Sequence, residues 1–431
     1  MTPRFRHVEF AIALFGLAFM SGTLTMVLTQ PNSLSSPMVQ VVGAAIGFFA
    51  VLSIWLERGA VNRVVSTYKL ALLPVAFAII SLIWTVDFGV TLRRAGALGL
   101  TTAFGLWLAM RFTPKQLFML VSVLTAIIIV ANFLVIQFIP SRGIHQTTDL
   151  LTAHHAGSWR GMLAHKNDFG RMMAFVFCLL VVAFMFRVGG RLGRFVALPL
   201  FGMAGMMIVY SNSAQAVLLF VLVPLVLVQM LSMSKVSSTT RALLLVLVAP
   251  AVVIVAMSAQ AVMTWGLGLV GRDPTLTGRT EIWESTLIGL QDIAFAGGGY
   301  GAGWEVVAAR MTALLGAAPA HAHNGYLDLA ADIGFFGLGL VLAVMIWNTI
   351  TSFRNLMQGV LPEISTLALT VLIFSFIGNI AGSFLLQFNS IYWVLIVATY
   401  CQLVDAKRES RSSYRPVNFA NGPYEAKQWV T

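Results

Sequence analysis

Runs of about 20 apolar residues recur along nearly the whole chain, and this pattern limits the possible folds more than any other feature. An α-helix needs about that many apolar residues to cross the hydrocarbon core of a bilayer. The composition agrees, because 58% of the 431 residues are hydrophobic and only 10% are charged, whereas soluble domains carry about 25% charged residues. The sequence therefore predicts an all-α integral membrane protein, folded as a polytopic helical bundle.

We expect about 12 transmembrane helices in a single transmembrane domain over residues 1–404, followed by a polar cytoplasmic tail over residues 405–431. The last two helices share one apolar run, which we divide at "LQFNSIYW". The expected spans are 8–28, 38–56, 69–86, 94–110, 117–139, 171–187, 195–211, 214–232, 242–260, 326–350, 363–385 and 388–404.

The basic residues predict the orientation of the chain in the membrane. Lys and Arg concentrate in loops such as "RVGGRLGR" and "SKVSSTTR", whereas the loop "TQPNSLSSP" carries no charge. Because cytoplasmic loops are enriched in Lys and Arg, both termini are expected in the cytoplasm. The net charge of +11 is thus explained by orientation, and no nucleic acid partner is expected.

Two long outer segments, residues 140–170 and 261–325, contain several arginines that run against this bias. The second segment is expected to form short amphipathic helices near residues 282–293 and 304–316. All histidines except His7 also lie in the outer segments: His145, His154, His155, His165, His321 and His323. Any chemistry is therefore expected on the outer face.

Cationic side chains in these segments indicate an anionic ligand. A guanidinium such as that of Arg279, in "TGRTEIW", offers paired donors that match phosphate oxygens. Arg160 in "WRGMLAHKN" is followed by His165 and Lys166, and it has the same potential. The alternative is that each cation extends to lipid headgroups, and their concentration on one face favours a ligand.

A glycine-rich stretch, "AGGGYGAGW" at residues 296–304, could bring main-chain N–H groups close to an anion, with Gly299 and Gly301 as candidates. The alternative is a flexible turn. A nucleotide loop is not indicated, because no strand precedes the stretch and no lysine follows it.

The stretch "HAHNGYLDLAADIGFF", which begins at His321, places ionisable groups at the start of an expected helix. A neutral His323 could accept a proton, and Asn324, Asp328 and Asp332 would share one helix face because they are four residues apart. The alternative is capping of the helix, which explains Asn324 better than it explains His323 or Asp332. The histidine pair has no third ligand at useful spacing, so neither a metal nor another cofactor is expected.

Five motifs together carry a family resemblance: "SLIWTVDFGVTLRRA" (81–95), "WRGMLAHKNDFGRMMA" (159–174), "GRTEIWE" (278–284), "GGGYGAGW" (297–304) and "AHNGYLDLAADIGFFGLGL" (322–340). In this order and spacing they resemble the O-antigen ligase and Wzy-type polymerase superfamily, most closely its exopolysaccharide-polymerase branch. The resemblance extends from about residue 81 to residue 404. It implies a metal-independent, inverting glycosyltransferase with a GT-C-type membrane fold in the bacterial inner membrane.

Such enzymes transfer a glycan from undecaprenyl diphosphate to a hydroxyl group on the periplasmic face, so the two long outer segments would be periplasmic loops. The acceptor is another lipid-linked repeat unit in polymerases and the lipid A core in ligases. Chain-length regulators and export proteins are the expected protein partners. The resemblance assigns diphosphate binding to Arg279 and the general base to His323. The family often has Ser-Arg where this chain has "SNSAQ" with Gln215, so Arg160 is the expected substitute for the second arginine.

Two other classes of protein are consistent with a basic polytopic chain. A transporter or lipid-linked-sugar flippase would normally place ionisable groups near the middle of the membrane, whereas Asp332 and Glu363 lie towards the ends of expected spans. A structural scaffold for polysaccharide export would leave the outer histidines and arginines dispensable. The sequence favours a site at the outer surface.

Overall fold

The computed structural model describes residues 3–29, 36–149, 152–233 and 277–413, together with residues 237 and 240. Within these residues the regular secondary structure is helical, and an isolated β-bridge joins Ile144 and Trp159. The all-α prediction is therefore confirmed for the described chain. The expected span at 242–260, residues 261–276 of the second outer segment and residues 414–431 of the tail lie outside it.

Six described helices are long and apolar enough to cross a membrane, as a polytopic membrane protein requires. They are α3 (Pro37–Leu56), α7 (Pro114–Phe138), α9 (Lys166–Met185), α10 (Gly190–Tyr210), α11 (Ala214–Ser232) and α15 (Gly325–Met357). The expected total of 12 spans and the GT-C-type fold remain predictions.

The other helices are shorter, less apolar or bent. The expected span at 69–86 corresponds to one arm of a bent pair, since α4 (Ala60–Thr67) meets the helix continuing from α5 (Lys69–Ile80) at 84°. The remaining elements are α1 (Pro3–Met20), α2 (Thr25–Leu28), η1 (Ser81–Ile83), α6 (Phe88–Arg111), α8 (Pro140–Gly143), η2 (Ala153–His155), α13 (Thr277–Gly289), η4 (Gln291–Ile293), α14 (Gly303–Leu315), α16 (Pro362–Gly378) and α17 (Ile391–Ser413).

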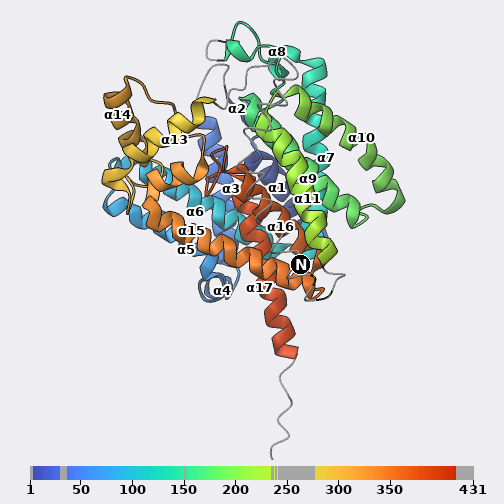
Figure 1. Cartoon of the computed structure of the whole chain (residues 1–431). Helices are drawn as coiled ribbons and strands as arrows, with labels where there is room; N and C mark the ends of the chain where they lie inside the picture. Colours follow the sequence, from blue (N-terminus) through green and yellow to red (C-terminus); the bar gives the residue numbers. More distant parts are fainter. Residues whose placement is uncertain are drawn as a thin grey trace, which may run out of the picture.

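Helix α16 lies between two groups of helices. Helices α7, α9, α10 and α11 pack together on one side of the molecule, and α5, α6, α13, α14 and α15 lie on the other (Figure 1). Helix α16 contacts α9 and α11 from the first group and α15 from the second. Nearly all of its residues are buried, as expected for a helix that is apolar on every face. The connection that follows α16 is therefore positioned between the two groups.

Helix α15 begins where the sequence predicted, but it is broken at Gly334, which has φ 70° and ψ 172°. The glycine-rich stretch fills the break. The N–H of Gly298 donates to the carbonyl of Ala331 (2.8 Å), and the N–H of Phe335 donates to the carbonyl of Ala294 (2.7 Å). Main-chain groups without partners in a bilayer cost several kcal/mol each. A Cβ on Gly334 would lie 2.0 Å from the carbonyl oxygen of Phe295, so glycine is needed for this approach.

The 81–95 motif binds the same glycine-rich stretch from the other side. The N–H of Val86 donates to the carbonyl of Gly298 (2.9 Å), and the indole N–H of Trp84 donates to the carbonyl of Ala296 (2.9 Å). The main-chain N–H of Tyr300 donates to Oγ of Ser81 (3.0 Å). Two motifs that are distant in sequence thus form one scaffold, which fixes the first part of α15.

Two short helices lie in the second outer segment, as expected, although α13 begins earlier than residue 282. In α14, Val307 and Met311 are buried four residues apart, so one face packs inward. Helix α13 packs against α14 and α15, and it carries Arg279 to the start of α15.

Candidate functional site

The site is organised by residues 379–383, the first part of the connection between α16 and α17; we call these residues the 379–383 segment. Its main chain binds two elements that the sequence singled out. The N–H of Gly325, at the start of α15, donates to the carbonyls of Asn379 (2.9 Å) and Gly382 (2.7 Å). The guanidinium of Arg279, on α13, donates from Nη1 to the carbonyl of Ala381 (3.0 Å).

Asn324 and Asp328 fix the start of α15. The side-chain oxygen of Asn324 accepts from the N–H groups of Tyr326 (3.0 Å) and Leu327 (3.3 Å), so the capping interpretation of Asn324 is confirmed. Asp328 accepts from the N–H of Ala322 at Oδ1 (2.7 Å) and from the hydroxyl of Ser383 at Oδ2. Both oxygens of Asp328 thus join neighbouring segments and support the site.

His323 stands directly before the cap in an unusual conformation. Its φ of 52° lies in the left-handed region, which non-glycine residues rarely adopt. Its ring lies 4.0 Å, centroid to centroid, from the ring of His321. Burial, followed by the nearby His321 and the charge of Arg279, lowers the pKa of His323 to about 4. The imidazole is therefore neutral at neutral pH and able to accept a proton.

Arg279 and His323, the two residues predicted to act together, lie in one region. Arg279 binds the 379–383 segment, and so does the N–H of Gly325, two residues after His323. The charge of Arg279 also contributes to the lowered pKa of His323. Burial lowers the pKa of Arg279, but from an ordinary value so high that the group stays cationic near neutral pH. The site therefore combines a permanent cation with a neutral imidazole.

His165 lies in the first outer segment, with its ring 5.8 Å, centroid to centroid, from the ring of His145. It is the N-cap of α9, and its Nδ1 accepts from the N–H of Asn167 (3.1 Å). In the neutral ring the proton is then on Nε2, which is a donor. His165 is also among the causes of the lowered pKa of His323. The sequence predicted His165 as a ligand-binding residue, and this role remains a prediction.

Arg171 and Gln215 lie against the same glycine of the 379–383 segment. A Cβ on Gly382 would lie 2.5 Å from Nε2 of Gln215 and 3.1 Å from Nη1 of Arg171. Gln215 donates to the carbonyl of Gly378 (2.6 Å). The guanidinium of Arg171 pairs with Asp168 (2.6 Å) and lies over the ring of Phe384, 4.6 Å from its centroid. Sequence reasoning gave Arg171 no role, although it lies in the 159–174 motif.

Arg160 and Lys166 have protein partners around the first outer segment. Arg160 donates to the carboxylate of Asp149 from Nη1 (2.9 Å) and to the carbonyl of Arg142 from Nε (2.9 Å). The N–H of Lys166 donates to Nε2 of His145 (3.2 Å). These contacts stabilise the loop before α9. The expected diphosphate roles of Arg160 and Lys166 remain predictions, and the site proposed below is built without them.

Gly299, Gly301 and Asp332 also have partners within the scaffold. The N–H of Gly299 donates to the carbonyl of Asp332 (2.9 Å), and the carbonyl of Gly301 accepts from the guanidinium of Arg94. The carboxylate of Asp332 accepts from the N–H of Gly303 (3.3 Å). These contacts join the glycine-rich stretch to the broken helix. They explain why a carboxylate lies deep in α15, and they favour a structural role over anion binding.

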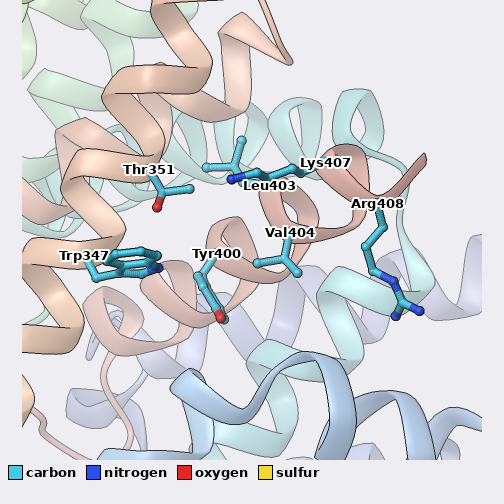
Figure 2. A pocket seen from close by; sticks show the side chains of 7 residues that line it. All are labelled: Trp347, Thr351, Tyr400, Leu403, Val404, Lys407 and Arg408. Carbon is cyan, nitrogen blue, oxygen red and sulfur yellow. The ribbon is translucent and has the colours of Figure 1, made fainter. Parts of the chain in front are cut away.

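A hollow at the other end of α15 lacks this chemistry. It measures about 190 Å³ and is lined by Trp347, Thr351, Tyr400, Leu403, Val404, Lys407 and Arg408 (Figure 2). Its lining offers two cations but no histidine or carboxylate that could act as a base. Among the described residues, no cluster of three or more His, Cys, Asp or Glu is placed to hold a metal ion, and metal independence remains a prediction.

The fold and the site define a helical membrane protein with a neutral imidazole and buried guanidinium groups gathered at one end of its broken helix. A family model described as O-antigen ligase matches residues 195–342, which include Gln215, Arg279 and His323. This match, over part of the chain, is consistent with the O-antigen ligase family that the motifs resemble. No curated protein matches the chain. The family supports glycosyltransferase activity of the ligase or polymerase type, and the exopolysaccharide-polymerase branch remains a prediction.

Proposed function

We propose that this protein transfers a glycan from an undecaprenyl-diphosphate-linked donor to a hydroxyl group of an acceptor on the periplasmic face of the bacterial inner membrane. The observation that carries the proposal is that Arg279 and Gly325, which lies two residues after His323, bind the same 379–383 segment, and that the charge of Arg279 contributes to the lowered pKa of His323. A cation and a neutral base in one place are what transfer from a diphosphate to a hydroxyl requires.

His323 removes the proton from the acceptor hydroxyl as that oxygen bonds to the anomeric carbon of the donor. The bond between the anomeric carbon and the phosphate oxygen breaks, and its electron pair leaves with undecaprenyl diphosphate. Attack from the face opposite the leaving group inverts the anomeric centre. A general base contributes typically 10²–10⁴-fold to such a step.

Arg279 stabilises the charge that develops on the departing diphosphate. Its side chain is held at the Ala381 carbonyl by one of its donors, which leaves others for phosphate oxygens. His165 offers a further donor from Nε2. The diphosphate charge also raises the proton affinity of His323 when the donor binds, so the base becomes stronger in the donor complex. The diphosphate already activates the sugar, and neither ATP nor a metal is needed in this mechanism.

The acceptor we favour is a second lipid-linked repeat unit, so that the protein polymerises exopolysaccharide or O-antigen repeats. Transfer to lipid A core, as a ligase, is the alternative acceptor for the same chemistry. In the polymerase case, chain-length regulator and export proteins would be its partners.

The test is incubation of the purified full-length protein with a lipid-diphosphate-linked repeat unit in the presence of a chelator, with and without lipid A core. Lengthened lipid-linked glycan supports a polymerase, and glycosylated core supports a ligase. If neither product forms while the lipid-linked glycan is moved across reconstituted vesicles, the protein is a transporter and the proposal fails.

A further inference from the structure

His321 lies beside the proposed base and is held by a set of contacts that the proposed chemistry does not use. Its Nδ1 accepts from the main-chain N–H of His323 (3.1 Å). The same nitrogen lies 3.2 Å from Oγ of Ser383 and 3.7 Å from Oδ2 of Asp328. The His321 side chain is 41% exposed, so burial alone does not explain its placement.

We propose that His321 positions His323 by accepting the hydrogen bond from its main chain, and that Asp328, itself bonded to Ser383, holds the segment that carries His321 through the N–H of Ala322. The inference rests on the proposed function, because it assumes that His323 is the base. It adds two positioning residues, His321 and Ser383, to which no role has been assigned.

The hydrogen bond from His323 to His321 runs from residue i+2 back to a side chain at residue i. Asn and Asp side chains make the same local bond in turns. It restrains the main chain next to His323, whose φ of 52° is otherwise costly for a residue with a side chain. Holding His323 in this conformation fixes the direction of its imidazole.

Ser383 and Asp328 hold the segment that carries His321. The hydroxyl of Ser383 donates to Oδ2 of Asp328, and Oδ1 of that carboxylate accepts from the N–H of Ala322. Asp328 is thus hydrogen-bonded both to the segment that carries His321 and to the 379–383 segment. Because Nδ1 accepts from the N–H of His323, neutral His321 carries its proton on Nε2. His321 is therefore an acceptor towards His323.

Two substitutions separate this role from others. In His321→Asn the amide oxygen lies where Nδ1 was and can accept from the N–H of His323, whereas in His321→Gln it lies nearer the former Nε2. We expect His321→Asn to keep most of the activity. His321→Gln should lower kcat by about tenfold to 100-fold, since small misplacements of a catalytic group have effects of this size. The KM for the donor should change little in both, because Arg279 is untouched. His7→Leu, at an exposed position of α1, is the control.

The assay uses purified full-length protein in nanodiscs with an undecaprenyl-diphosphate-linked repeat unit, and each variant is first checked for monodispersity and melting temperature. Equal activity of the Asn and Gln variants overturns the proposal. If His321→Asn is as inactive as His323→Ala, His321 itself transfers protons and the positioning role is wrong. Product formation by the wild type tests the proposed function separately. Independently of turnover, a structure of His321→Gln should show His323 outside the left-handed region, and an unchanged φ contradicts the inference.

Discussion

The substitution Arg279→Lys tests whether Arg279 binds a diphosphate or only extends to lipid headgroups. The change keeps the positive charge but removes the planar pair of donors. In the structure one donor, Nη1, is used at the Ala381 carbonyl (3.0 Å). A lysine at this position has a single ammonium group, so it cannot keep that contact and also reach two phosphate oxygens with the same geometry.

The expected loss follows from the contacts removed. One hydrogen bond to a charged group contributes about 1.5–3 kcal/mol. A loss of this size slows the reaction by about tenfold to about 150-fold, because each 1.36 kcal/mol is a factor of about ten. If the contact strengthens as the diphosphate departs, the loss appears in kcat and not in KM alone.

The assay measures kcat and KM of Arg279→Lys with a lipid-diphosphate-linked repeat unit. Arg310→Lys is the matched control. Arg310, on α14, pairs with the exposed carboxylate of Asp292 and not with the 379–383 segment. We expect the control to keep wild-type rates. An unchanged rate for Arg279→Lys would refute the diphosphate role and favour simple headgroup contact.

Three other predictions follow from the site and the scaffold. Replacing His323 with Ala should lower the rate by about 10²–10⁴-fold while lipid-linked repeat units accumulate in cells; wild-type polymer from this variant would remove the base role. The pKa of His323 in the free protein is lowered to about 4. We therefore expect kcat/KM to be maintained as pH falls through about 6.5, the ordinary histidine pKa, and to decline only near pH 4. A loss of kcat/KM centred near pH ~6.5 would contradict a buried neutral base. Gly303→Ala should lower the free energy of unfolding by about 1–3 kcal/mol or more, because the new Cβ would lie 1.8 Å from the carbonyl oxygen of Ala331. The control is Gly339→Ala, whose Cβ would have no atom within 4 Å. The melting temperature of this control should be unchanged or higher.

The sequence was sufficient to predict a helical membrane protein and the start of α15. Asn324 is a strong capping residue before an apolar run, so its role could be read locally. The resemblance assigned Arg279 and His323 to one site, and their roles remain predictions. Both features involve polar or ionisable residues, which are costly to place in a membrane and are therefore informative in an apolar sequence.

The structure was needed where function depends on contacts between distant segments. The break in α15 at Gly334 is not visible in an apolar run, so the glycine-rich stretch was interpreted as a turn or an anion site rather than as its partner. Ser383 carries no charge and lies in an apolar region, and its link to Asp328 appears only when α16 and α17 are placed. The sequence alone indicated that Arg160 could bind a diphosphate, and only the structure shows that its guanidinium pairs with Asp149.

The proposed transfer requires a donor diphosphate between Arg279 and His323 at the 379–383 segment. The most direct test is a cryo-electron microscopy structure of the full-length protein with a non-transferable phosphonate analogue of the lipid-diphosphate donor. We expect phosphate oxygens at the guanidinium of Arg279 and an anomeric carbon that faces the acceptor side of His323. An analogue bound in the hollow at the other end of α15, or with its diphosphate away from Arg279, would contradict the proposed transfer.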